Sequence, residues 1–466
     1  MVAVANMPEA DRALLREPLH AIAGRIQSRD VSPVGLAELS LAEIERTHTE
    51  RNAFRIVLRE RALTAARKAE QEIAGGEYRG PLHGVPLAVK DLMDVAGETT
   101  PAGSKVLAQR VATEDSEVVR LLDAAGATIV GKTSMPEFAY SPGSNNQHYG
   151  PVPNPWNAAF DSGGSSSGSG AALAAGLVFG ATGSDTGGSI RMPSAACGTV
   201  GLKPTFGRVS ARGAVVLSWS LDHIGPMTRT VRDAALMLDV MAGFDSGDPR
   251  TRRVAAGPYA LSVDDGVTGL RVAVLADDGL GELGTPAVLN GVEQAARVLE
   301  AAGASVAEVV IPESSDLSAL YGVILTIEAA AYYERFLKER PDELGEFARD
   351  RLLTAYAYEP TTWVKCQQAR SVLRQRIMER LEGFDLIVTP GMPHEAPPLG
   401  IVQQNTRFTG PFNALGWPAI VVPTLLGDHG LPVSVQIAAR PWLETLVLRA
   451  AQVIERDGPW QGQMPS

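Results

Sequence analysis

Residues 161–176, DSGGSSSGSGAALAAG, decide whether the chain folds as one unit or as two units joined by a linker. Runs of serine and glycine often form flexible linkers. Here the run passes directly into AALAAGLVF, residues 171–179, a stretch of small apolar residues suited to a buried helix. Because linkers seldom continue into buried helices, we interpret the run as part of the core of one domain.

The sequence on both sides of this run predicts an α/β fold. Ser32-Pro33 is typical of a helix start, and apolar residues at helical spacing follow it. Residues 116–133, SEVVRLLDAAGATIVGKT, indicate a helix, a glycine turn and a strand. This alternation resumes beyond residue 230 and favours a parallel sheet. We therefore predict a single α/β domain over residues 1–466, with a mixed, mostly parallel, twisted central sheet covered by helices on both faces.

Within this domain the pattern divides the chain into four consecutive parts. They are a helical N-terminal segment at about 8–75, a core at about 80–230, a helical elaboration at about 245–380, and C-terminal strands with a helix at about 384–456. No internal repeat and no linker separates them.

Composition excludes several classes of function. Against 42 Lys and Arg there are 53 Asp and Glu, a net charge of −11, which disfavours nucleic-acid binding. Cys197 and Cys366 form no CxxC pair, so we expect no disulfide framework and no metal site. The N-terminus does not resemble a signal peptide, and no apolar run approaches the roughly 20 residues of a membrane span. We expect a cytoplasmic protein with no membrane partner and no cofactor.

Lys90, in GVPLAVKDL (residues 84–92), lies where an apolar strand is predicted. Lysine is rarely buried without a partner, and burial favours its neutral form. A neutral lysine can accept a proton and so act as a base. The simpler alternative is a structural ion pair with Asp91 or Asp94, and the sequence leaves both possibilities open.

Two glycine-rich turns add candidate nucleophiles, Ser165 in GGSSSG and Ser189 in GSDTGGSIR. A serine becomes nucleophilic when a base lies within hydrogen-bond reach. Glycines allow the backbone to approach a reacting carbonyl closely. In the second turn, consecutive N–H groups can point into one concavity and stabilise an oxyanion. The predicted oxyanion hole comprises Thr186, Gly187, Gly188 and Ser189.

Three long motifs are together similar to those of the amidase signature family. They are GPLHGVPLAVKDLMDVAG (80–97), NPWNAAFDSGGSSSGSGAALAAG (154–176) and GSDTGGSIRMPSAACGTVGLKPTFGRVS (183–210). The resemblance extends to GPFNALGWPAIVVPT (410–424) and covers roughly residues 15–455. It implies the amidase signature fold and an enzyme that hydrolyses the C–N bond of an amide.

The resemblance also implies roles for individual residues. Ser189 corresponds to the nucleophile that forms an acyl-enzyme, Ser165 to a bridging serine after a cis peptide bond, and Lys90 to the base of the relay. The chain departs from the family at Ser167, where glycine is usual, and at Ser162, where proline is common. These changes leave the shape of the substrate-side loop open. Residues expected to support the site structurally are Asp185, Arg191 and Asp222.

Substrate choice depends on loops outside the motifs. An apolar pocket there would suit a small hydrophobic or aryl amide, and the same chemistry extends to esters and carbamates. Relatives often form homodimers, so a homodimer is a further expectation. Candidate wall residues are Phe138, Tyr140, Gly143, Tyr356, Trp363 and Trp417.

Other functions remain as alternatives. GSSSG, residues 164–168, fits the nucleophile elbow G-x-S-x-G with Ser166 as nucleophile, although no strand precedes it. A histidine-based mechanism, a nucleotide-binding protein and a non-catalytic protein are weaker alternatives. The strongest is the glutaminase subunit of a tRNA-dependent amidotransferase. Its tyrosine-rich segment is reduced here to Tyr356 and Tyr358.

Overall fold

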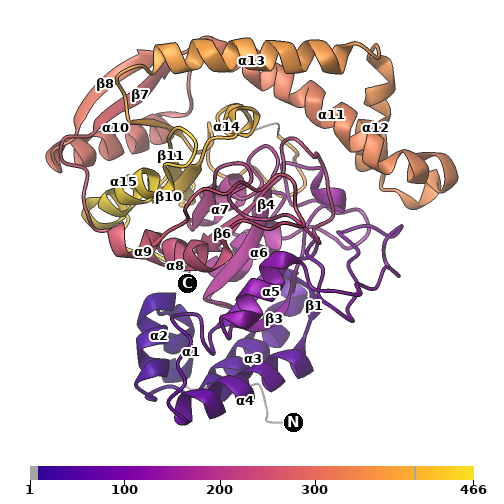
Figure 1. Ribbon diagram of the computed structural model, residues 1–466, viewed down its shortest axis with the longest axis vertical. Helices are drawn as coiled ribbons and strands as arrows, with labels where there is room; N and C mark the ends of the chain where they lie inside the picture. The colour runs from indigo at the N-terminus through magenta and orange to yellow at the C-terminus, as the bar shows by residue number, and fades with distance from the viewer. Residues whose placement is uncertain (1–8, 404–405, 466) are drawn as a thin grey trace.

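The predicted strands join one twisted sheet in the computed structural model, which describes residues 9–403 and 406–465 (Figure 1). Over these residues the sheet has eleven strands: β1 (Phe54–Val57), β2 (Pro86–Lys90), β3 (Thr128–Thr133), β4 (Gly180–Asp185), β5 (Val200–Lys203), β6 (His223–Thr228), β7 (Arg271–Asp277), β8 (Ser305–Val310), β9 (Leu386–Pro390), β10 (Ala419–Leu426) and β11 (Pro432–Ala438). Their order across the sheet is β1-β3-β2-β4-β6-β5-β10-β11-β9-β7-β8.

The α/β class and the mixed sheet are confirmed, but the parallel majority is wrong. Four neighbouring pairs are parallel, in the blocks β3-β2-β4 and β9-β7-β8. The other six pairs are antiparallel. Helix–strand alternation predicts the two parallel blocks. It misses the antiparallel centre, where β10 and β11 form a hairpin whose short connection cannot make a parallel crossover.

Helices cover both faces of the sheet, as predicted. Every residue of β2, β3, β4 and β6 is buried, which a strand achieves only when both faces are covered. Over the described residues the α-helices are α1 (Glu9–Arg16), α2 (Leu19–Gln27), α3 (Pro33–Arg51), α4 (Arg59–Ala74), α5 (Glu117–Ala124), α6 (Ser167–Ala174), α7 (Arg191–Cys197), α8 (Val231–Met241), α9 (Tyr259–Ser262), α10 (Pro286–Ala301), α11 (Glu313–Glu339), α12 (Glu346–Leu353), α13 (Thr362–Arg380), α14 (Gly410–Leu415) and α15 (Glu444–Asp457).

The serine–glycine run becomes the buried helix α6, so the linker interpretation is excluded. All eight residues of α6 are buried. A Cβ atom at Gly168 would lie 2.2 Å from the carbonyl oxygen of Ala53, so this position of the helix requires glycine. The small residues of the run therefore allow α6 to pack directly against neighbouring backbone.

The N-terminal segment follows the predicted helices with one exception. Ser32 caps α3 by accepting a hydrogen bond from the Gly35 amide at 3.0 Å, and Pro33 is its first residue. The prediction of helices throughout residues 8–75 misses β1, a short strand that pairs antiparallel with β3 at the sheet edge.

Residues 245–380, predicted as a helical elaboration, do not form one separate layer, because β7 and β8 lie in this range and join the sheet. The helices that follow them, α11 to α13, form a layer over one end of the sheet. The long helix α11 packs against α12, α13 and α14, and α11 and α13 run along the top of the molecule in Figure 1. Within the described ranges, none of the helices has the length and apolar character needed to cross a membrane. In the same part of the chain, no cluster of His, Cys, Asp and Glu could hold a metal ion.

Candidate active site

Lys90 is the last residue of β2, and its side chain is fully buried. Its Nζ lies 2.8 Å from Ser165 Oγ and 2.9 Å from Ser184 Oγ. Burial disfavours the ammonium form and lowers the pKa of Lys90 to about 7, although Asp185 and Asp222 oppose this shift. Near neutral pH the amine is therefore partly unprotonated, as a proton acceptor must be.

A structural ion pair does not explain the buried Lys90. Asp91 instead faces Lys132, with Oδ1 3.5 Å from Nζ, and Asp94 pairs with Arg110 at 2.5 Å. Successive side chains at the end of a strand point to opposite faces, so Asp91 is directed away from Lys90. The alternative of pairing with either aspartate is wrong.

Ser165 and Ser189 lie in two turns that contact each other. The peptide bond between Gly164 and Ser165 is cis, as the resemblance implies. The Ser166 amide donates to the Ser189 carbonyl at 3.1 Å, which holds the turns side by side. Ser189 faces a pocket, whereas Ser165 lies beneath it with 0% exposure. Among the hydrogen bonds of the described residues, none joins the Ser165 and Ser189 hydroxyls, a link that unliganded active sites often lack.

Three of the four residues predicted for the oxyanion hole contribute to the lining of the pocket. Thr186, Gly187 and Ser189 line it. Gly188 does not, because its N–H donates to Asp185 Oδ1 at 2.8 Å. The prediction of Gly188 as an oxyanion donor is therefore wrong. Asp185 uses this amide to shape the turn instead.

Asp185 and Arg191 form the buried support of this turn. Arg191 Nη2 lies 2.9 Å from Asp185 Oδ1, and both side chains are fully buried. Burial alone would raise the pKa of Asp185, but the Arg191 guanidinium and other donors hold it well below its usual range. Arg191 also donates to Gln436 and Asn413, each at 2.6 Å, which ties the turn to β11 and α14.

Asp222 supports the same turn from its other end. Its Oδ1 accepts the Thr186 hydroxyl at 2.6 Å, and its Oδ2 accepts the Leu217 amide at 2.9 Å. Burial raises the pKa of Asp222 to about 6, against the opposing effect of these hydrogen bonds. Asp185 and Asp222 thus fix the two ends of one short turn.

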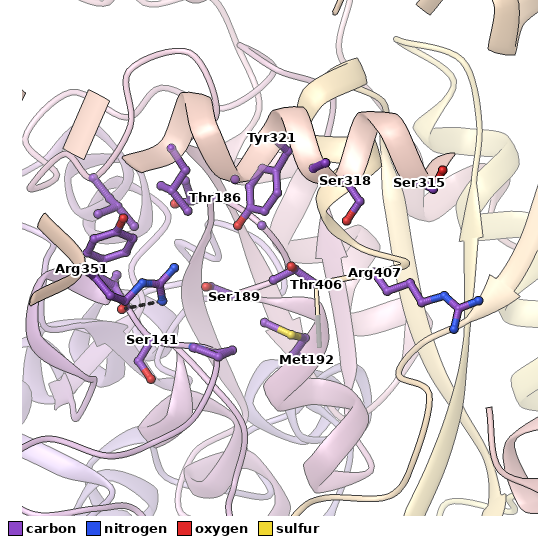
Figure 2. A pocket seen from close by; sticks show the side chains of 18 of the residues that line it. Ser141, Thr186, Ser189, Met192, Ser315, Ser318, Tyr321, Arg351, Thr406 and Arg407 are labelled. Atoms are coloured by element: carbon purple, nitrogen blue, oxygen red, sulfur yellow. Dashed lines mark hydrogen bonds between the residues drawn. The ribbon is translucent and has the colours of Figure 1, made fainter. Parts of the chain in front are cut away.

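Figure 2 shows the pocket of about 430 Å³ into which Ser189 points. Its roof is one face of α11, including Tyr321 and Gly322. A Cβ atom at Gly187 would lie 1.7 Å from Tyr321 Oη, so the turn requires glycine here. Burial raises the pKa of Tyr321 above its usual range, which keeps its hydroxyl protonated beside Gly187.

The charged residues lining the described pocket are two arginines at opposite ends (Figure 2). Arg407 is neutralised by Asp278, at 2.6 Å, and also donates to backbone carbonyls. Arg351 lies 4.1 Å over the Tyr140 ring and donates to the Tyr140 carbonyl at 3.2 Å. Among the described residues no carboxylate forms a salt bridge with Arg351. The Arg351 end of the pocket therefore carries an uncompensated positive charge.

Of the six predicted wall residues, only Tyr140 lines this pocket. Phe138 is buried against Tyr333, with ring centroids 3.9 Å apart. Trp417 is buried in the core, and Gly143 lies against Asp161. Tyr356 and Trp363 are exposed on the helical layer. Sequence alone cannot distinguish aromatic residues of the core or surface from those that line a pocket, because all of them are large and mostly apolar.

The other candidate nucleophile and the histidines lie elsewhere. Ser166 is buried outside the pocket, and its hydroxyl contacts the Ser184 carbonyl at 3.4 Å. No strand precedes it, as the elbow motif would require. His83 and His148 contact Glu72 and Glu137 at 3.0 and 3.1 Å, respectively. Within the described lining of the pocket there is no histidine.

Sequence reasoning missed several residues of the site. Ser184 is two residues from Thr182 on β4, and both side chains reach Lys90: Thr182 accepts its amide and Ser184 contacts Nζ. Polar residues alternating in a buried strand were an available signal. For Arg351 and Tyr321 there was no such signal, since Arg351 lies among other charged residues of α12 and Tyr321 lies in an apolar stretch of α11 that is typical of core.

The fold is that of an amidase-type hydrolase, and comparison with known proteins agrees. A family model described as Amidase matches residues 36–448, and the chain belongs to this family, the amidase signature enzymes. Such enzymes hydrolyse C–N bonds of non-peptide amides.

Individual relatives are similar over nearly the whole chain. A glutamyl-tRNA(Gln) amidotransferase subunit of Koribacter versatilis is 37% identical, over 92% of this chain and 96% of its own. A solved structure described as an unexpected vestigial protein complex that reveals the evolutionary origins of an s-triazine catabolic enzyme has a TM-score of 0.91 and 36% identity, covering 95% of this chain and 99% of its own. 6-Aminohexanoate cyclic dimer hydrolase, complexed with substrate, has a TM-score of 0.88 and 30% identity, covering 97% and 99%.

Proposed function

We propose that the chain hydrolyses a small amide bearing a carboxylate, through an acyl-enzyme on Ser189. The 2.8 Å contact between Lys90 Nζ and Ser165 Oγ supports the mechanism, because it joins a buried amine of lowered pKa to the neighbouring serine. The uncompensated guanidinium of Arg351 supports the carboxylate, since a buried anion requires a fixed cation or donor.

The first half of the reaction transfers the acyl group. Ser189 Oγ attacks the amide carbon while its proton passes to Ser165, whose own proton passes to neutral Lys90. The amides of Thr186, Gly187 and Ser189 hold the oxyanion that forms. The C–N bond then breaks, the leaving nitrogen takes a proton back from Lys90 through Ser165, and the acyl group stays on Ser189.

The second half uses water as the nucleophile. Water loses a proton to the same relay and attacks the acyl-enzyme, and the Ser189–acyl bond breaks. Ser189 regains its proton, and the carboxylic acid leaves. Each half therefore returns Lys90 to its neutral state, so no external acid or base is consumed at the site.

The proposed carboxylate-bearing substrate replaces the hydrophobic or aryl amide that the sequence predicts. The predicted aromatic walls, Tyr140 excepted, lie outside the pocket, and Arg351 favours an anionic group instead. Esters and carbamates remain predictions, because the same relay can attack their carbonyls. The expected homodimer likewise remains a prediction.

A second candidate is glutamine hydrolysis that supplies ammonia to a partner protein. It is favoured by the name of the Koribacter versatilis relative, which is part of an amidotransferase. Glutamine is itself a carboxylate-bearing primary amide, so the two candidates share the Arg351 end of the pocket. Against it, Tyr356 and Tyr358, the remnant of the tyrosine-rich segment, are exposed outside the pocket.

The test is a substrate panel with the purified protein and Ser189→Ala as the blank. Glutaramate and glutaramide differ only in whether the distal group is a carboxylate or a neutral amide, and glutamine and an anilide complete the panel. We expect glutaramate to be hydrolysed with a higher kcat/KM than glutaramide. Equal or reversed preference would contradict the carboxylate proposal. Glutamine hydrolysis that needs an added amidotransferase partner would select the second candidate.

A further inference from the structure

One turn beyond the pocket, Glu328 of α11 gathers four hydrogen-bond donors from two other segments. Its Oε2 accepts the Ser218 hydroxyl at 2.6 Å and the Ser220 amide at 3.0 Å. Its Oε1 accepts the Ser220 hydroxyl at 2.8 Å and Trp363 Nε1 at 3.2 Å. Three of these four bonds go to the loop 216–222, so the carboxylate mainly fastens this loop to α11.

Tyr333, further along the same helix, fastens the start of that loop. Its hydroxyl donates to the Val216 carbonyl at 2.6 Å, and its ring stacks on Phe138 at 3.9 Å between centroids. Glu328 and Tyr333 therefore hold the loop at Val216, Ser218 and Ser220. The helix that roofs the pocket thus fixes the path of a loop that belongs to the core.

The loop ends at Asp222, which contacts the oxyanion turn. Asp222 Oδ2 accepts the amides of Leu217 and Ser218 at 2.9 and 3.1 Å, so its orientation depends on the loop backbone. Its Oδ1 accepts the Thr186 hydroxyl at 2.6 Å. Thr186 faces the pocket together with Ser189 and Tyr321 (Figure 2). A continuous set of hydrogen bonds therefore joins Glu328 to the turn.

We infer that Glu328 is a positioning residue for the oxyanion turn. It holds the 216–222 loop, the loop orients Asp222, and Asp222 fixes Thr186 and with it the amides that face the reacting carbonyl. Oxyanion donors act only at hydrogen-bond distance, and a displacement of about 1 Å can lower a rate by about 100-fold. This inference rests on the proposed function, because it needs an acyl transfer at Ser189.

In α11 the residues that face the substrate pocket and the positioning residue Glu328 lie on different turns of the helix. Tyr321, Gly322 and Leu325 face the pocket, while Glu328 lies outside it. Loss of Glu328 should therefore lower the rate of the chemical step and leave ground-state binding almost unchanged. A residue that merely stabilised the helix would affect both.

The experiment measures the second-order rate at which a fluorophosphonate labels Ser189, since the phosphonyl oxygen uses the same oxyanion donors. We expect Glu328→Ala to lower this rate, and kcat for glutaramate, by about 10-fold, with KM changed by less than about 2-fold. The matched control is Glu334→Ala, which removes an exposed pair with Lys338 on the same helix. The control should label at the wild-type rate.

A double-mutant cycle tests the path through Thr186. Thr186→Val removes the hydroxyl that Asp222 holds, so Glu328→Ala should add little to it if both act on the same turn. Full multiplication of the two fold-changes would overturn the inference.

If Glu328→Ala does not fold, Glu328→Gln replaces it. The glutamine amide has one oxygen and one NH2 group, so an N–H must face either Trp363 Nε1 or the Ser220 amide. We expect a loss of about 3-fold, which Trp363→Phe reduces because it leaves a position where the NH2 group opposes no donor. No loss would overturn the inference.

The outcomes separate the two proposals. A wild-type protein that the probe does not label at Ser189 would overturn the proposed function. A wild-type protein that is labelled at Ser189, with a folded Glu328→Ala variant labelled at the same rate, would overturn the positioning role of Glu328 alone.

Discussion

The core turns around Lys90 and the helical roof over the pocket meet at Ser189, but they are built differently. Lys90, Ser165 and Asp185 are fully buried, and neighbouring core residues hold each of them. Gly322 in the roof, and Arg351 of α12 at one end of the pocket, are only partly buried and have few fixed polar partners. The difference indicates that the core turns carry out the reaction. The pocket-facing residues of the roof determine which amide is admitted, whereas Glu328, one turn further along α11, acts on the core turn through the loop 216–222.

The largest expected effect comes from removing the nucleophile in the core. Ser189→Ala should lower kcat/KM for glutaramate by roughly 10⁵-fold, because the acyl-enzyme cannot form. Ser166→Ala, measured in the same assay, is the control for the neighbouring turn and should retain most activity. Loss of activity in the Ser166 variant with activity retained in the Ser189 variant would reverse the assignment.

Lys90 is expected to set the pH dependence. Neutral Lys90 accepts the proton, so kcat/KM should fall as the pH drops through about 7 and reach a plateau above it. Lys90→Ala should remove this limb and lower amide hydrolysis by about 10³-fold, and ester hydrolysis by less, since esters need less protonation of the leaving group. Equal losses for an amide and its matched ester would contradict this role of Lys90.

At one end of the pocket, Arg351 should determine the preference for a negatively charged substrate and not the rate of the chemical step. Hydrogen bonds to charged groups contribute about 1.5–3 kcal/mol, so Arg351→Met should lower kcat/KM for glutaramate by about 10- to 100-fold. The neutral glutaramide should be nearly unaffected. The ratio of the two kcat/KM values, in wild type and variant, is the measurement. An unchanged ratio would mean that Arg351 does not bind the carboxylate of the substrate.

Substitutions at Gly322 test whether the substrate occupies the space beneath the roof. A Cβ atom at this position would have no neighbour within 4 Å. Gly322→Ala should therefore raise the free energy of unfolding by about 0.5–1 kcal/mol, as expected for glycine replaced within a helix. Gly322→Leu should lower turnover of bulky amides by a few fold while small amides react normally. Denaturant unfolding and a substrate size series measure the two effects.

The smallest effects are expected at the aromatic residues that the structure places outside the pocket. Tyr356 is 57% exposed, so Tyr356→Ala should change kcat/KM by less than about 2-fold. A larger effect on glutamine hydrolysis alone would show that Tyr356 contacts glutamine, and would favour the amidotransferase candidate.

The same contrast explains what the sequence could predict. Ser165 and Ser189 stand in glycine-rich turns and Lys90 in an apolar strand, which makes them candidates, and the resemblance to the amidase signature family implies their roles. Sequence reasoning misassigns Gly188 because consecutive N–H groups suggest a common direction, whereas Asp185 turns this one away. The parallel blocks of the sheet follow from helix–strand alternation. The antiparallel centre does not, because it combines the β10–β11 hairpin with pairs such as β5 and β10, whose strands lie far apart in the sequence.

The roof could not be predicted in the same way. Arg351 lies 162 residues after Ser189 in a helix that contains one other arginine, Arg349, and only the packing of α12 brings it to the pocket. Tyr321, which lines the pocket, and Tyr332, which is exposed, lie in the same helix and are the same type of residue. Substrate-binding residues therefore require the three-dimensional structure, whereas catalytic candidates do not.

The most direct test of the central claim is to locate the covalent intermediate. Lys90→Ala should accumulate an acyl-enzyme from an activated aryl ester of glutarate. Both halves lose the base, but the aryl oxide leaves without a proton, so acylation by this activated ester is slowed less than attack by water on the unactivated acyl-enzyme. After acid quench and proteolysis, mass spectrometry should place the glutaryl group on Ser189. A glutaryl group on Ser166, or hydrolysis by this variant at the wild-type rate with no adduct, would contradict the account.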